Sequence, residues 1–143
     1  MKKFLGLLLM LAANFAHAQI ANGSYAQYFK EGNYLMLEEN YGLALKNYLS
    51  AYELDSSSAN INYNVGVCYL KSPTKKADAE AKLVKAVAHV AKNYRMDDPT
   101  EKDAPPLAYF YYAQALHINY KFDEAIEQYA KFEKYVEGDK QWK

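Results

Sequence analysis

The side chains best able to do chemistry in this chain are two histidines and one cysteine. His89 and His117 are candidate metal ligands or general bases, but neither has a partner of ligand type four residues away on the same helix turn. Cys68 lies in the apolar stretch 65–70 without a neighbouring base or cation. We therefore expect the histidines to lie on helix surfaces or in a groove, and the thiol to be a buried packing residue.

A short run of acids, Asp97, Asp98, Glu101 and Asp103, is the remaining candidate for metal binding. It lacks the spacing and the glycine of a calcium-binding loop, so we expect a solvated loop. No phosphate-binding glycine loop, nucleophile elbow or zinc-protease pattern occurs. The sequence predicts a protein that is not an enzyme and uses no metal or cofactor.

The first eighteen residues have the pattern of a secretory signal peptide. Lys2 and Lys3 precede a short apolar stretch at 4–15, and Ala16-His17-Ala18 supplies small residues at the cleavage positions. The alternative is a retained membrane anchor, although the stretch is short for a bilayer. We expect residues 1–18 to be removed and residues 19–143 to be exported.

Charge and hydropathy restrict the partners of the exported chain. Without Lys2 and Lys3, fifteen basic residues face seventeen acidic ones, which gives a net charge of −2. That balance does not favour nucleic acid or anionic lipid. Beyond the signal no apolar run is long enough to span a bilayer, so we expect no integral membrane protein after cleavage.

Apolar periodicity predicts helices throughout the exported chain and no strand. Prolines at 99, 105 and 106 break the pattern and predict an irregular insertion at 94–105. We expect the helices at 25–38, 43–54, 59–70, 75–93, from the prolines to 119, and 122–135. Ser24 is the expected N-cap of the first.

Small residues recur at matching offsets along these predicted helices. The pairs are Gly32 with Ala44, Gly66 with Ala79, and Ala113 with Ala125, and a large residue (Tyr48, Leu83 or Tyr129) follows each second member by four. Repetition with a period in the mid-thirties is typical of stacked helical hairpins, whose helices approach closely at small residues.

This pattern resembles the tetratricopeptide repeat (TPR). The matching residues are Tyr28, Gly32, Leu35, Ala44, Tyr48, Ala51 and Ser56 in the first copy; Gly66, Tyr69, Ala79, Leu83 and Ala86 in the second; and Tyr109, Ala113, Leu116, Ala125 and Tyr129 in the third. The departures are Asn62 at an aromatic position, Phe132 at a small one, the absence of a closing proline, and the insertion. The resemblance implies an all-α, right-handed superhelical stack of about three TPR hairpins at 25–58, 59–93 and 106–139. A helical bundle without repeats is the competing fold.

The tyrosine-rich segments 59–66 and 108–112 are also similar to the TPR region of certain Bacteroidota envelope proteins. In those proteins that region precedes a WD40-like β-propeller and an OmpA-like peptidoglycan-binding domain. This likeness implies a location in the periplasm or at the periplasmic face of the outer membrane, and an envelope or peptidoglycan-associated complex.

The TPR resemblance also implies a concave groove, lined by the first helix of each hairpin, that binds a protein or peptide. The positions that face this groove are Phe29, Asn33, Met36, Asn60, Tyr63, Val67, Leu70, Leu107, Phe110, Gln114 and His117. The same aromatic residues are equally suited to filling the core. Relatives that bind a terminal carboxylate use cations where this chain has Phe29, Leu107 and Tyr111, so we expect no carboxylate clamp.

Two functions fit these observations. The first is an exported scaffold or adaptor that mediates protein–protein interaction in the cell envelope. The second is a structural N-terminal spacer of a larger OmpA-like protein, docking through Tyr129 to Tyr135. The sequence does not identify the partner.

Overall fold

A computed structural model describes residues 23–137, and this part of the chain is helical. It contains the α-helices α2 (Tyr25–Leu37), α3 (Tyr41–Leu54), α4 (Ala59–Lys71), α5 (Ala79–Ala86), α6 (Leu107–Ile118) and α7 (Phe122–Val136), with a 3₁₀ turn, η1 (Lys76–Asp78). Between residues 23 and 137 there is no strand, only one isolated bridge between Val90 and Ala104. The predicted all-α class is confirmed, whereas the signal peptide predicted at 1–18 lies outside the described residues.

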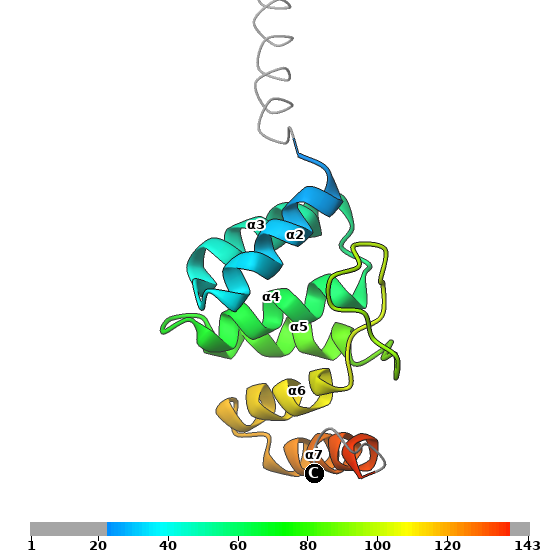
Figure 1. Cartoon of the computed structure of the whole chain (residues 1–143). Helices are drawn as coiled ribbons and strands as arrows, with labels where there is room; N and C mark the ends of the chain where they lie inside the picture. The colour runs from blue at the N-terminus through cyan, green and yellow to red at the C-terminus, as the bar shows by residue number, and fades with distance from the viewer. Residues whose placement is uncertain (1–22, 138–143) are drawn as a thin grey trace, which may run out of the picture.

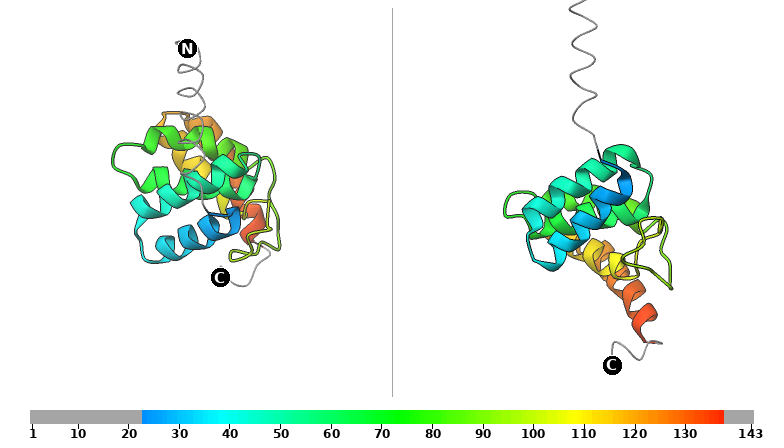
Figure 2. Two further views of the ribbon diagram at one scale, coloured as in Figure 1. Left: turned by 90° about the horizontal axis from the view of Figure 1, so that it is seen from above. Right: turned by 45° about the horizontal axis from the view of Figure 1, so that its top comes forward.

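The helices form three consecutive pairs that stack in chain order. α2 packs on α3, α4 on α5 and α6 on α7, and the pairs join through α3 against α4 and α5 against α6 (Figure 1). The segment between α5 and α6 leaves the stack and runs beside the first two pairs (Figure 2). No helix within 23–137 combines the length and the apolarity needed to cross a bilayer.

The polar residues of the turns set where helices begin. The side chains of Ser24, Asn40 and Ser58 each accept a hydrogen bond from a backbone N–H of the following first turn. The cap at Asn40 lets α3 begin at Tyr41, two residues earlier than predicted. The expected cap at Ser24 is confirmed.

The first and third pairs share the same turn. Glu39 and Tyr120 both have a positive φ, of 56° and 61° respectively. Each lies five residues before the small residue of the following helix, which is Ala44 in the first pair and Ala125 in the third. The N–H that follows each of them donates over 2.9 Å to a carbonyl of the preceding helix. Glutamate and tyrosine have no common preference for this left-handed conformation, so its occurrence at both turns indicates that the two hairpins share one turn geometry.

Glycine allows close packing inside the first two hairpins. A Cβ on Gly32 would lie 2.5 Å from the ring of Tyr48, and one on Gly66 would lie 2.6 Å from Cγ of Leu83. Tyr48 and Leu83 each stand four residues after the alanine with which we paired the glycine. The nearest neighbour of each glycine is therefore this large side chain, and both hairpins pack in the same register.

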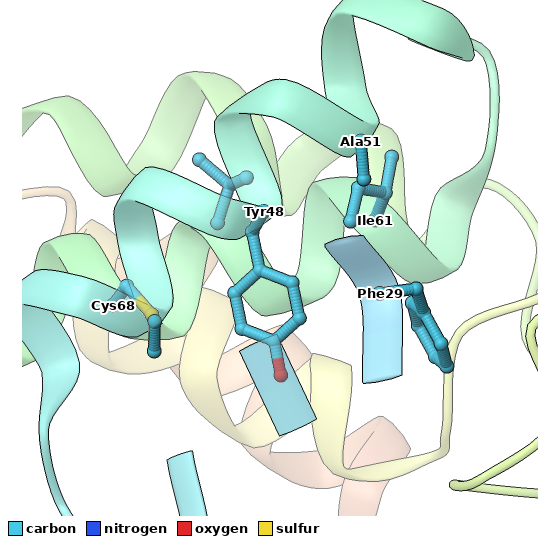
Figure 3. Packing of buried hydrophobic residues seen from close by; sticks show 7 residues of the cluster. Phe29, Tyr48, Ala51, Ile61 and Cys68 are labelled. Atoms are coloured by element: carbon cyan, nitrogen blue, oxygen red, sulfur yellow. The ribbon is translucent and has the colours of Figure 1, made fainter. Parts of the chain in front are cut away.

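The largest buried cluster joins the first pair to α4. Phe29, Tyr48, Ala51 and Ile61 are fully buried there (Figure 3). Burial of their apolar surface stabilises the fold by about 25 cal/mol for each Å² that is removed from water. Cys68 belongs to the same cluster, and burial raises the pKa of its thiol to about 12. The predicted packing role of this cysteine is confirmed.

The fourth helix is shorter than the sequence predicted. We expected it to reach residue 93, but α5 ends at Ala86 and the irregular segment begins at Val87. The reason is a competing set of hydrogen bonds: the carbonyl of His89 accepts from the N–H of Ala104 (2.8 Å), whose carbonyl accepts from the N–H of Ala91 (3.0 Å). The insertion therefore covers 87–106, and we use that range below.

Candidate functional site

A cavity of about 490 Å³ lies between the first helices of the pairs, the insertion and the C-terminal part of α7. Most of its lining is apolar or aromatic, which suits the apolar part of a ligand. The lining residues are Asn33, Met36, Leu37, Tyr48, Tyr63, Asn64, Lys92, Tyr94, Met96, Pro105, Pro106, Leu107, Phe132, Tyr135 and Val136. They come from all three hairpins and from the insertion.

Asn33 fixes the insertion to α2. Its Nδ2 donates a hydrogen bond to the carbonyl of Met96 over 2.8 Å, and its Oδ1 accepts one from the hydroxyl of Tyr48, also over 2.8 Å. The tyrosine ring packs under Gly32, so the close approach of α2 and α3 places the hydroxyl that orients the amide. The position of Met96 at the cavity thus depends on the packing of the first hairpin.

Asn60 fixes the insertion to the start of α4. This side chain is fully buried. Its Nδ2 donates to the carbonyl of Glu101 (3.2 Å), and its Oδ1 accepts from the hydroxyl of Tyr94 (2.8 Å) and from Nδ2 of Asn64 (3.1 Å). Since a buried amide without partners is costly, this network determines where Tyr94 lies in the cavity wall.

An ion pair holds the insertion from outside. Nζ of Lys102 lies 2.5 Å from a carboxylate oxygen of Asp55 and 4.6 Å from the ring centre of Tyr25. The hydrogen bond from Lys102, followed by one from Ser57, lowers the pKa of Asp55 to about 2. Both charges are partly exposed, so the pair contributes modestly.

The cavity has one charged residue in its lining, and its buried phenols are neutral. Lys92 is the one charged residue of the lining and makes no ion pair with any described residue. Burial raises the pKa of Tyr63 and of Tyr94, so both phenols are neutral at physiological pH. The site thus offers apolar surface, neutral donors and acceptors, and one cation at its edge.

The cavity gathers some of the residues that the sequence singled out and leaves others elsewhere. Asn33, Met36, Tyr63 and Leu107 line it. Phe29, Asn60 and Val67 are buried, so they contribute to packing and to the hydrogen-bond network. Phe110 contacts the rings of Tyr111, Tyr129 and Phe132 inside the third hairpin.

The remaining predicted residues lie at a second, smaller cavity of about 360 Å³ between the second and third hairpins. Leu70, Gln114 and His117 line it together with Lys71 and Lys76. The residues predicted to face one groove thus line two separate cavities. Within residues 23–137 no cluster of three or more histidine, cysteine or acidic side chains is placed to bind a metal ion.

Sequence reasoning missed the part of the site that the insertion supplies. We expected a solvated loop, but Tyr94, Met96, Pro105 and Pro106 form one wall of the cavity, and Ala104 is fully buried. Apolar residues among the charges of this segment were the available signal. No protein-family model matches the chain, and no curated protein matches it.

Proposed function

We propose that this chain is an exported TPR scaffold that binds a short apolar segment of a protein partner in the cavity described above. The observation that carries the proposal is the cavity itself, since three hairpins and the insertion jointly build a mainly apolar hollow of about 490 Å³. Such a hollow takes one or two large apolar side chains rather than a long extended peptide.

The repeat geometry supports the TPR part of this proposal. The contacts of Gly32 with Tyr48 and of Gly66 with Leu83 fall at equivalent positions, and the turns at Glu39 and Tyr120 share one backbone conformation. Each pair also packs on the next in chain order. A helical bundle without repeats gives no reason for such equivalence.

The asparagine contacts bear on how the partner binds. Asn33 and Asn60 donate to backbone carbonyls of the insertion, as they would to the backbone of an extended ligand. The insertion therefore occupies this part of the groove, and the partner contacts a surface that the insertion helps to form. Function is binding, without a catalytic step, metal or cofactor.

Affinity capture with matched variants tests this function. Leu37 and Met96 line the cavity yet are 71% and 55% exposed, so Leu37→Glu and Met96→Lys change the cavity without emptying the core. Leu43→Glu is the control, because Leu43 is 51% exposed and does not line the cavity. From an envelope extract, the wild type and the control should retain the same partner and both cavity variants should lose it. Retention by all four proteins would refute the cavity as the binding site.

The second candidate function is a structural spacer in a larger envelope protein. The tyrosines at the two ends of its predicted docking segment, Tyr129 and Tyr135, contact α6: Tyr129 contacts Phe110, and Tyr135 stacks on Tyr109 at 5.8 Å between ring centres. The observation that favours a docking role is the exposure of Phe122 and Ile126 on the same helix, α7.

Fractionation of source cells separates the two functions. An antibody against residues 23–137 should detect a soluble periplasmic protein near the mass of the exported chain if this is a scaffold. A much larger protein that sediments with outer membrane and peptidoglycan would favour the spacer. A cytoplasmic signal would contradict the proposed export.

A further inference from the structure

One buried amide in the cavity wall has an acceptor without a partner. Asn64 lines the cavity, although only 6% of its surface is exposed. Its Nδ2 donates to the backbone carbonyl and to Oδ1 of Asn60, each over 3.1 Å, so both amide hydrogens are used inside the protein. Its Oδ1 accepts no hydrogen bond from any residue within 23–137. A ligand that enters the cavity must therefore supply a donor at this oxygen or lose affinity.

The orientation of this amide is fixed by its neighbours. A backbone carbonyl only accepts, so the atom of Asn64 that faces the carbonyl of Asn60 must be the nitrogen. Asn60 is itself held in place, since its Nδ2 donates to the carbonyl of Glu101 and its Oδ1 also accepts from the hydroxyl of Tyr94. The oxygen of Asn64 is therefore the free end of this network.

The oxygen of Asn64 is also accessible to a ligand. Among the described residues, the buried side-chain atoms that are both enclosed and unpartnered are the hydroxyl oxygen of Tyr25 and Oδ1 of Asn62. Oδ1 of Asn64 is unpartnered without being enclosed, and its residue belongs to the cavity lining. A group bound in the cavity can therefore reach it.

The phenols of the lining do not set the polarity of a ligand. The hydroxyls of Tyr48 and Tyr94 each donate to an asparagine of the protein. Those of Tyr63 and Tyr135 can either donate or accept, as any hydroxyl can. Asn64 therefore determines which hydrogen-bonding group the ligand presents, and that group is a donor.

Neither an acidic nor a basic ligand fits this acceptor. A carboxylate at Oδ1 of Asn64 would bring acceptor oxygens together, and Nδ2 has no hydrogen left to donate. Lys92, the one charged residue of the lining, is exposed, so an acid paired with it would contribute little. A lysine or arginine side chain would lose its hydration in a mainly apolar cavity. The donor of the ligand is therefore neutral.

Tryptophan is the side chain that combines a neutral donor with a large apolar surface. Its indole N–H donates and, unlike a hydroxyl or an amide, brings no acceptor that needs a partner of its own. The lining offers rings on which an indole can pack, from Tyr63, Tyr94, Phe132 and Tyr135. A cavity of about 490 Å³ holds one indole together with part of the chain that carries it.

We propose that the partner segment inserts a tryptophan side chain into the cavity and that its indole N–H donates to Oδ1 of Asn64. This inference rests on the cavity function proposed above and names the residue type that the cavity selects. Asn64 then determines specificity, whereas the apolar lining contributes affinity. Tryptophan is among the residues that most often dominate the binding energy of protein interfaces.

Titration with two matched probes tests the hydrogen bond on the full chain, expressed and purified in the form that the cell exports. The probes are N-acetyltryptophanamide and its benzothiophene analogue, in which sulfur replaces the indole N–H and the shape is kept. The parent protein for this test carries Trp142→Phe, which removes the one tryptophan of the chain, outside the described residues, as a competing occupant. Binding followed by NMR chemical shifts should be about three- to tenfold tighter for the tryptophan probe, the effect of one hydrogen bond.

Variants separate the hydrogen bond from the cavity itself. Asn64→Leu keeps the approximate size of the side chain but removes the acceptor, so it should bind both probes with equal affinity. Leu37→Glu should weaken both probes, because Leu37 lines the cavity, and the control Leu43→Glu, outside the lining, should weaken neither. Circular dichroism establishes that each variant is folded. The comparison of the two probes on the parent protein does not depend on the folding of Asn64→Leu.

The outcomes separate this proposal from the cavity function. Equal affinity of the parent protein for the two probes would overturn the proposal, and so would a preference that survives in Asn64→Leu. Tighter binding of N-acetyltyrosinamide than of the tryptophan probe, or no binding up to the solubility limit, would also overturn it. The cavity function stands in each of these cases as long as Leu37→Glu loses the captured partner. Failure of that capture test would refute the cavity function and this proposal together.

Discussion

Replacing Gly32 by alanine tests the hairpin packing with a single methyl group. In most helix interiors this change stabilises a protein, because alanine loses less conformational entropy and has the higher helix propensity. At Gly32 the added Cβ would lie 2.5 and 2.6 Å from two ring carbons of Tyr48, far inside the 3.4 Å at which ordinary contact begins. The ring is fully buried, and its hydroxyl is hydrogen-bonded to Asn33, so it has little freedom to move away.

The expected magnitude follows from these two opposing terms. Overpacking of a tight core costs about 1–3 kcal/mol, and the helix gain offsets roughly 0.5–1 kcal/mol of it. We therefore expect Gly32→Ala to lower the free energy of unfolding by about 1–2 kcal/mol. A shift of the ring would also strain the hydrogen bond to Asn33, which holds Met96 at the cavity.

Thermal and urea unfolding followed by circular dichroism measure this effect against a matched control. Gly42 lies in α3, and a Cβ there would have no neighbour within 4 Å. Gly42→Ala should therefore raise the melting temperature, whereas Gly32→Ala should lower it by about 4 °C for each kcal/mol. Gly66→Ala should behave like Gly32→Ala, because its Cβ would meet Leu83 at 2.6 Å. Stabilisation by all three substitutions would refute the packing register.

Three further predictions concern the insertion and the thiol. Asn60→Ala leaves the hydroxyl of Tyr94 and the carbonyl of Glu101 without their partner, so it should lower the free energy of unfolding by about 2–4 kcal/mol. It should also expose residues 87–106 to cleavage by trypsin, whereas the control Asn47→Ala should not. Unchanged protection of this segment in Asn60→Ala would contradict the network. Lys102→Met should lower stability by about 0.5–1 kcal/mol above pH 4. Because the pKa of Asp55 is depressed to about 2, this difference should shrink as the pH falls from 4 toward 2, and a difference that persists at pH 2 would count against the pair. Cys68, with its pKa raised to about 12 by burial, should not react with a thiol reagent at pH 8 until the protein is denatured, and prompt labelling of the native protein would contradict its burial.

Most of the fold could be predicted from the sequence, because helices and close hairpin contacts leave local signals. The apolar period predicted the helices, and Ser24 and the prolines predicted where two of them begin. Gly32 and Gly66 predicted where the helices of the first two hairpins approach closely. The length of α5 could not be predicted, because its end is set by hydrogen bonds to Ala104 across the insertion. Such non-local competition has no signature in a window of neighbouring residues.

The candidate site could be predicted only in part, for the same reason. Asn33, Met36 and Tyr63 were identified from positions on the first helices, and they line the cavity. Asn60 was assigned to the same surface, but it is buried because the insertion folds back over it. The contributions of Tyr94 and Met96 depend on where that segment docks, which the spacing of residues along the chain does not encode.

The central claim, that a protein partner occupies the cavity, is tested most directly by photocrosslinking in living cells of the source organism. A photoreactive phenylalanine analogue in place of Met96 stands at the cavity, and the same analogue in place of Leu43 stands outside it at a similar exposure. The account predicts a crosslinked species that forms from position 96, is absent from position 43, and disappears when Leu37→Glu is added. The same crosslinked species from both positions, or none from position 96, would contradict it.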